Sequence, residues 1–124
     1  MVEGKKRIKS FEDLVVWQEA HKLAVIIYEV TKNFPVDERF SLTSQYRRAA
    51  YSVSANIAEG FGRRTNNDKL HFYTIAYGST LEVKNFTLLS GSLGYMKDQK
   101  QIELVLAQIV SCQKLLNAFV KAHK

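Results

Sequence analysis

Proline and cysteine are almost absent from this chain of 124 residues, which has one of each and only six glycines. Proline and glycine are the residues that most often interrupt helices, so their scarcity favours an all-α protein with long helices. The single Cys112 cannot form an internal disulfide, and no cluster of cysteine and histidine has the spacing of a zinc site. We therefore expect a cytoplasmic protein without a metal or another cofactor.

Long apolar runs are also missing. No run approaches the roughly 18 residues that would cross a bilayer, and the opening segment MVEGKKRIK lacks the hydrophobic stretch of a signal peptide. The sequence thus predicts no membrane segment and no export. The length suits one domain with a real core, which we place at residues 10–124. Residues 1–9 are expected to form a basic arm, carrying Lys5, Lys6, Arg7 and Lys9, that is more often a frayed terminus than a phosphate contact.

Four helices are predicted, over about residues 11–33, 40–60, 67–92 and 98–122. Ser10 to Asp13 and Asp98 to Gln101 have the spacing of a capping box, which begins a helix. Pro35 disfavours helical geometry in the residue before it and so ends the first helix. Helices of this length joined by short turns fold back on one another, which predicts a left-handed, antiparallel, up-and-down four-helix bundle.

The apolar periodicity predicts the core of this bundle. Its expected members are Leu14, Ile27, Val53, Ile57, Leu81, Leu88, Ile109 and Leu116. In the first helix the expected apolar face also includes Val15. Gly78 and Ser79 lie in the middle of the third helix, where glycine is unfavourable, and so predict a close helix crossing. Gly60 and Gly62 are expected to end the second helix through the left-handed conformation that glycine accepts.

A polar stripe accompanies the apolar face of the second helix. Its members, at helical spacing, are Gln45, Arg48, Ser52, Asn56 and Glu59. Small alanines beside the stripe would let another helix approach and partly desolvate these groups. A desolvated charge is tolerated only when it is paired. We therefore expect Arg48 and Glu59 to have fixed partners on another helix or another subunit.

The formal net charge of +6 favours an anionic partner such as nucleic acid or an acidic protein surface. Arg63 and Arg64 follow the second helix and precede the N-terminus of the third, whose free N–H groups attract anions. With Lys69 they are the predicted phosphate contacts, and Arg47 and the basic arm are secondary ones. A solvated charged turn explains the same arginines equally well. Nearby aromatic residues at helical spacing, Tyr46, Tyr51, Phe61, Tyr73 and Tyr77, are expected in the core rather than as base-stacking surfaces.

Catalytic patterns are not found. No glutamate has a histidine three residues later, as di-iron bundles require, and Gly60 and Gly62 lack the rest of a nucleotide-binding fingerprint. Cys112 falls on the apolar face of the fourth helix, where a thiol is a small hydrophobe and stays protonated. We therefore expect no enzyme activity.

Several motifs together resemble one known family. They are VWQ at Val16 to Gln18, FP at Phe34 and Pro35, QYRRAA from Gln45, NIAEGFGRR from Asn56, and IAYGS at Ile75 to Ser79. The chain resembles the bacterial four-helix-bundle family named for proteins encoded in intervening sequences of large-subunit ribosomal RNA genes, which also contains accessory proteins of diversity-generating retroelements. After IAxGS the family usually continues Leu-x-Glu-Leu-Glu. Here Glu82 is kept, and we group it with the polar interface residues, whereas Lys84 reverses the second acid.

The resemblance covers about residues 11–115 and implies a barrel-like homopentamer that binds nucleic acid and has no enzyme activity. Two hypotheses follow. The first is an oligomer whose arginines and lysines hold RNA or DNA phosphates without reading sequence. The second is an adaptor whose basic surface docks a larger protein, such as a reverse transcriptase, that itself binds the nucleic acid.

Overall fold

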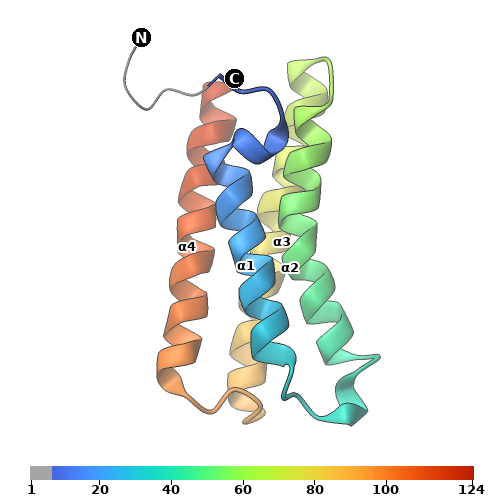
Figure 1. The fold of residues 1–124 in the computed structure, drawn as a ribbon, viewed down its shortest axis with the longest axis vertical. Helices are drawn as coiled ribbons and strands as arrows, with labels where there is room; N and C mark the ends of the chain where they lie inside the picture. Colours follow the sequence, from blue (N-terminus) through green and yellow to red (C-terminus); the bar gives the residue numbers. More distant parts are fainter. Residues whose placement is uncertain (1–6) are drawn as a thin grey trace.

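The computed structural model describes residues 7–124, and Lys5 and Lys6 of the predicted arm lie outside them. Four helices run alternately up and down (Figure 1): α1 (Val15–Thr31), α2 (Leu42–Phe61), α3 (Asn66–Ser92) and α4 (Gln99–Ala122). Two short 3-10 turns, η1 (Phe11–Asp13) and η2 (Val36–Glu38), precede α1 and α2. No strand occurs within residues 7–124. The predicted all-α, up-and-down bundle is confirmed.

The first helix begins later than predicted. The capping box of Ser10 and Asp13 closes only the turn η1, because Leu14 is extended, with φ −78° and ψ 127°. This break interrupts the helical register, so that α1 starts at Val15. The expected inward position of Val15 is therefore wrong. Its side chain is exposed, whereas that of Val16 is buried.

The core contains six of the eight residues predicted for it. Leu14, Ile27, Val53, Ile57, Ile109 and Leu116 are buried. Leu81 and Leu88 of α3 are not, because they are 50% and 49% exposed. The inward face of α3 is formed instead by Tyr73, Ala76, Ser79, Thr80, Val83, Thr87 and Ser90.

Small hydroxyl side chains explain why the register of α3 was misread. Ser79, Thr80 and Thr87 donate hydrogen bonds to the carbonyls of Ile75, Tyr77 and Val83 in their own helix. A hydroxyl bonded in this way is buried at little cost. These residues can therefore face the core while the larger leucines face outward, an arrangement opposite to the one that hydrophobicity alone predicts.

Hydrogen bonds between helices fix how the four helices align. The Tyr46 hydroxyl on α2 lies 2.6 Å from Thr87 Oγ1 on α3. On α4, Gln113 Nε2 donates to Thr80 Oγ1 on α3 at 3.1 Å, and Gln108 Nε2 donates to the Glu19 carbonyl on α1 at 2.9 Å. Each bond satisfies a polar group away from water, and together they tie α2 and α4 to their neighbours.

The structural roles of Gly60 and Gly78 differ from those predicted. Gly60 lies inside α2, and Gly62 caps it with φ −79°, so neither adopts the left-handed conformation. Gly60 is required because a Cβ there would lie 2.6 Å from Cε1 of Tyr73. The close crossing of α2 and α3 predicted at Ser79 is present, since its Oγ lies 3.0 Å from that of Ser52. Gly78, however, faces outward, and a Cβ there would meet nothing within 4 Å.

Among the described residues, α4 is the one helix that is long and apolar enough to cross a membrane by length and composition alone. This departs from the expectation based on uninterrupted apolar runs, because an average over the helix tolerates Glu103 and Lys114. Core helices of soluble proteins meet the same criterion, so it is weak support for a membrane segment. In the bundle, Val105, Ile109 and Leu116 of α4 are buried in the core.

Candidate nucleic-acid interface

The predicted phosphate contacts surround the turn from α2 to α3, at one end of the bundle. The C-terminus and the described part of the N-terminal segment lie at the same end (Figure 1). A hydrogen bond of 3.1 Å from Asn66 Nδ2 to the His123 carbonyl joins the start of α3 to the end of α4. The basic residues at this end of the bundle, which we call the basic end, are Arg7, Lys9, Arg63, Arg64, Lys69, Lys121 and Lys124.

Arg63 is held by contacts within the chain. Its guanidinium donates to Glu59 Oε2 at 2.9 Å and lies over the Phe72 ring, 4.6 Å from the ring centroid. Both charged side chains are about half exposed, so the ion pair contributes little stability. The guanidinium has five N–H donors, and most of them remain available to a phosphate. We expected the partner of Glu59 to lie on another helix or another subunit. In the structure its partner is Arg63, one turn further along the chain.

Lys69 has a structural role that its position in the sequence does not reveal. Its ammonium donates to the carbonyl of Phe61 at 2.7 Å and to that of Gly60 at 3.5 Å. These are carbonyls at the C-terminus of α2, where a positive charge also offsets the negative end of the helix dipole. Lys69 thus fixes the turn that presents Arg63 and Arg64, and one of its three donors remains for a ligand.

Arg64 is the cation of this turn that the protein leaves free. It is exposed and makes no hydrogen bond or ion pair with residues 7–124. The neighbouring N-terminus of α3 is already capped, because Thr65 Oγ1 accepts from the N–H of Asp68 at 3.1 Å. The acid Asp68 also lies in this first turn and weakens the attraction for an anion. The arginines, rather than the helix terminus, are therefore the main attraction for phosphate here.

Arg47 does not join this group. It lies near the start of α2, roughly 24 Å from Arg63 at about 1.5 Å of rise per residue. Its Nε donates to Thr31 Oγ1 at 2.7 Å, and its guanidinium lies over the Tyr28 ring, 4.6 Å from the centroid. Arg47 therefore belongs to a second basic cluster at the opposite end of the bundle.

The polar stripe of α2 contacts α3 through Ser52. Asn56 Nδ2 donates to the Ser52 carbonyl at 2.8 Å, and Ser52 Oγ accepts from Ser79 of α3. Arg48 on α2 and Glu82 on α3 are exposed, and neither makes an ion pair among the described residues. Gln45 is likewise exposed and without a hydrogen-bond partner there. Ser52 and Asn56 thus bond within the bundle, whereas Gln45, Arg48 and Glu82 are available to another molecule.

Sequence reasoning missed the second basic cluster. Arg39, Phe40 and Thr43, around the start of α2, lie beside Arg47 and were not expected to take part in binding. The feature that marks this cluster is an exposed aromatic ring beside arginines, since Phe40 is 90% exposed. The placement of the other aromatics was largely right, with Tyr46 and Tyr73 buried and Phe61 and Tyr77 half-buried. Tyr51 is an exception, because it is exposed beside this cluster.

Comparisons with known proteins identify the family. The family model described as 23S rRNA-intervening sequence protein matches residues 12–118. The chain belongs to this family. A solved structure from Bacteroides thetaiotaomicron VPI-5482, a protein of unknown function from the S23 ribosomal protein family, is similar in fold, with a TM-score of 0.76. The match has 24% sequence identity and covers 86% of this chain and 99% of the other, so it supports the fold alone. No curated protein matches the chain.

Membership of the 23S rRNA-intervening sequence protein family brings the motif residues into one region of the structure. The NIAEGFGRR motif spans the last turns of α2 and the turn that carries Arg63 and Arg64. Within it, Gly60 allows the close approach of α3, and Asn56 bonds to the Ser52 carbonyl one turn earlier in α2. Among the described residues, no group of three or more histidine, cysteine or acidic side chains could hold a metal ion.

Proposed function

We propose that this member of the family is a non-enzymatic homo-oligomer that binds RNA or DNA without sequence preference. The observation that carries the nucleic-acid part is the basic end of the bundle, where Arg64 has no partner among residues 7–124. Phosphates attract such a surface at every nucleotide, so binding does not depend on the base sequence. Repetition of the basic end in an oligomer, most simply a pentamer, would multiply a weak contact into useful affinity.

The outer surface of α3 supports assembly. Large apolar side chains are exposed along this helix and at its C-cap, namely Ile75, Leu81, Leu88 and Leu89 on α3 and Leu93 just after it. Exposed apolar patches often mark a surface that contacts another protein. Gly78 lies on the same outer surface with open space in front of it, although alanine would be favoured by about 1 kcal/mol in a helix interior. Close contact with another copy would explain both the leucines and the glycine.

Charged residues beside this surface suggest how the copies align. Arg48 on α2 and Glu82 on α3 are both exposed, and neither is paired among residues 7–124. In an oligomer, Arg48 of one copy and Glu82 of the next would neutralise each other. Such a pair would fix the alignment of the copies more than it would add affinity.

An electrophoretic shift experiment tests the nucleic-acid part. A short single-stranded RNA should be retarded at about 50 mM salt and released at about 200 mM, because counterion release weakens phosphate contacts. The double variant R63A/R64A should bind all sequences more weakly. The control variant K22A/K100A removes the same charge from exposed lysines elsewhere on the bundle, and it should bind like the parent. Equal retardation of all three proteins would exclude these arginines as the binding surface.

An adaptor function remains the second candidate, and one observation favours it. Leu104 on α4 is 59% exposed on a different helix from the apolar surface of α3. A homo-oligomer that uses α3 would leave Leu104 uncovered, so a larger protein partner could bind there. If the parent protein retards no RNA or DNA even in low salt, the adaptor hypothesis replaces direct binding.

A further inference from the structure

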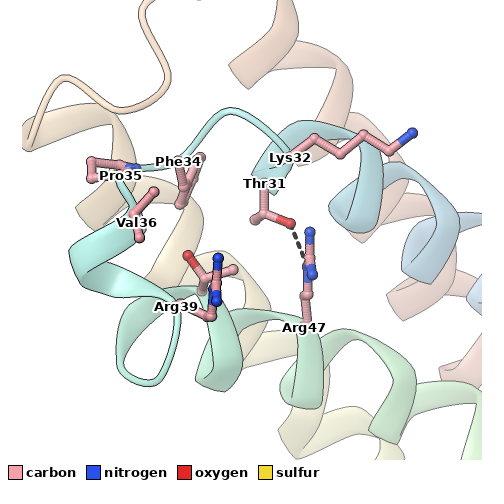
Figure 2. Close-up of a pocket in the computed structure, with 8 residues that line it drawn as sticks. Thr31, Lys32, Phe34, Pro35, Val36, Arg39 and Arg47 are labelled. Atoms are coloured by element: carbon pink, nitrogen blue, oxygen red, sulfur yellow. Dashed lines mark hydrogen bonds between the residues drawn. The ribbon is translucent and has the colours of Figure 1, made fainter.

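The second basic cluster surrounds two adjoining cavities between the end of α1 and the start of α2. The smaller cavity, of about 190 Å³, is lined by Thr31, Lys32, Phe34, Pro35, Val36, Arg39, Thr43 and Arg47 (Figure 2). The larger, of about 360 Å³, shares three of these residues, Arg39, Thr43 and Arg47. It is otherwise lined by Tyr28, Phe40, Ser44, Arg48 and Tyr51. One cavity is therefore small and cationic, and the other has an aromatic wall.

The arginines that line these cavities are not neutralised by nearby acids. Arg39 and Arg47, which line both cavities, make no ion pair within residues 7–124. The acid Glu38 lies just before α2, where its Oε1 accepts from the Leu42 N–H at 3.5 Å and its Oε2 accepts from the Tyr95 hydroxyl at 2.8 Å, so it makes no ion pair with these arginines. Lys32 is less available, because it pairs with Glu29 at 3.0 Å. An anion that enters the smaller cavity would therefore meet unpaired guanidinium groups.

Arg47 is oriented before any ligand arrives. Its Nε donates to Thr31 Oγ1 (Figure 2), and one terminal nitrogen lies 3.4 Å from the Tyr28 carbonyl oxygen. The Tyr28 ring lies beneath its guanidinium. The side chain thus keeps free N–H donors in a fixed direction, which lowers the entropy lost when an anion binds. Arg39 extends toward the same cavity and is exposed, so it can close over a ligand.

The start of α2 adds unsatisfied donors. Ser41 provides no side-chain cap, and the N–H groups of Thr43 and Ser44 have no acceptor among the described residues. The side chain of Thr43 is also unsatisfied, because the residue is 8% exposed and its Oγ1 has no hydrogen-bond partner. A buried hydroxyl without a partner is unusual in proteins. A phosphate oxygen would satisfy both the hydroxyl and the positive end of the helix.

We propose that these two cavities bind one nucleotide, with its phosphate in the smaller cavity and its base against the aromatic wall of the larger. The smaller cavity is below the volume of about 300 Å³ at which drug-sized pockets begin, and so suits a phosphate group. Phe40 offers a base a nearly bare ring, because it is 90% exposed. An acidic peptide would use the arginines but would leave this ring in water. A nucleotide uses both features.

This nucleotide site is distinct from the basic end that carries Arg63 and Arg64. It could hold a free nucleotide or one nucleotide of a strand, because both present the same phosphate and base. The two sources are distinguished by competition. Suppose that a short single strand displaces a bound mononucleotide at a lower concentration, counted in nucleotides, than free mononucleotide requires. The ligand is then a strand. If the strand does not compete, the ligand is the free mononucleotide.

The test measures the binding of adenosine 5′-monophosphate, adenosine and inorganic phosphate to the full-length protein, by NMR titration. The monophosphate should bind more tightly than either fragment. The variant R39A should weaken its binding at least about tenfold, as expected for loss of a charge-assisted contact, and F40A should weaken it several-fold. Both side chains are exposed, so neither change should unfold the protein, which circular dichroism would check. Arg47 is left intact because it also supports α1.

Two matched controls separate this site from the basic end. K22A, which removes one exposed charge from α1, should leave adenosine 5′-monophosphate binding unchanged. R63A/R64A should weaken the binding of strands while it leaves mononucleotide binding unchanged, so a failure of one site is distinguishable from a failure of the other. The proposal is overturned if adenosine binds as tightly as its monophosphate, if R39A and F40A bind like the parent, or if no binding of the monophosphate is detected.

Discussion

Gly60 of α2 and Tyr73 of α3 approach so closely that a Cβ added to the glycine would lie 2.6 Å from the tyrosine ring. Tyr73 is fully buried, and its ring packs against Phe119 of α4. The contact therefore joins three helices just below the turn that carries Arg63 and Arg64. Because it fixes how α2 and α3 leave this turn, the packing of one glycine positions the basic end of the bundle.

Substitution of Gly60 by alanine should destabilise the protein. The ring of Tyr73 would have to move within a filled core, and overpacking of this kind costs about 1–3 kcal/mol. Alanine gains only about 1 kcal/mol of helix propensity, so the melting temperature should fall. Gly62→Ala is the matched control, because a Cβ at that residue would make only ordinary contacts, the nearest at 3.6 Å from the Glu59 carbonyl oxygen. A G60A protein that melts no lower than the parent would contradict the close approach.

Ile57→Asp should unfold the protein. Ile57 is completely buried, and an unpaired carboxylate at that position would cost several kcal/mol, a large part of a total stability of about 5–15 kcal/mol. Circular dichroism should show loss of helix at room temperature. Retention of a cooperative transition within a few degrees of the parent would mean that Ile57 lies outside the core.

Leu81→Asp should leave the helices folded and reduce the size of the assembly. The side chain is half exposed in the single chain, so the charge can stay in water until another copy approaches. Light scattering at micromolar concentration should then report a smaller mass than for the parent. Leu104→Asp, which changes a somewhat more exposed leucine on α4, is the control and should keep the parental mass. A parent protein that is monomeric in this measurement would remove the proposed assembly itself.

Cys112 should make stability depend on alkaline pH. Burial raises the pKa of its thiol to about 12, with a smaller effect from Glu19. Since the folded pKa lies above the unfolded value of about 8.5, the folded protein favours the protonated thiol. The contribution is complete below about pH 8.5 and is lost as the pH rises toward 12. The free energy of unfolding, measured with denaturant at several pH values, should therefore fall less steeply at alkaline pH for Cys112→Ala than for the parent. Identical pH dependence in both proteins would contradict the burial of this thiol.

Much of the fold was predictable because its signals are local. Apolar spacing and Pro35 gave the four helices to within a few residues, and the burial of Val53, Ile57 and Cys112 is confirmed. The register of α3 was not predictable from hydrophobicity. Hydroxyls such as those of Thr80 and Thr87 bond to their own helix and fill the tight crossing, whereas Leu81 and Leu88 remain outside.

The candidate site was predictable only in part. The sequence indicated arginines and lysines at the turn after α2. Which of these side chains are free depends on contacts that form only when the chain folds. Lys69 turns back to the end of α2, and Arg63 lies over Phe72. Arg47 was predicted as a secondary phosphate contact, although the length of α2 separates it from this turn. The cluster around Arg39 and Thr43 exists only because the chain folds back at η2.

The salt dependence of nucleic-acid binding tests the central claim most directly. The affinity of the parent protein for a fluorescently labelled single strand would be measured by anisotropy at salt concentrations from about 50 to 200 mM, with two strands of unrelated sequence. We predict that the logarithm of the affinity falls linearly with the logarithm of the salt concentration, with the same slope for both strands and a smaller slope for R63A/R64A. Binding that does not change with salt, or no binding at the lowest salt, would contradict the proposal that the basic end holds phosphates.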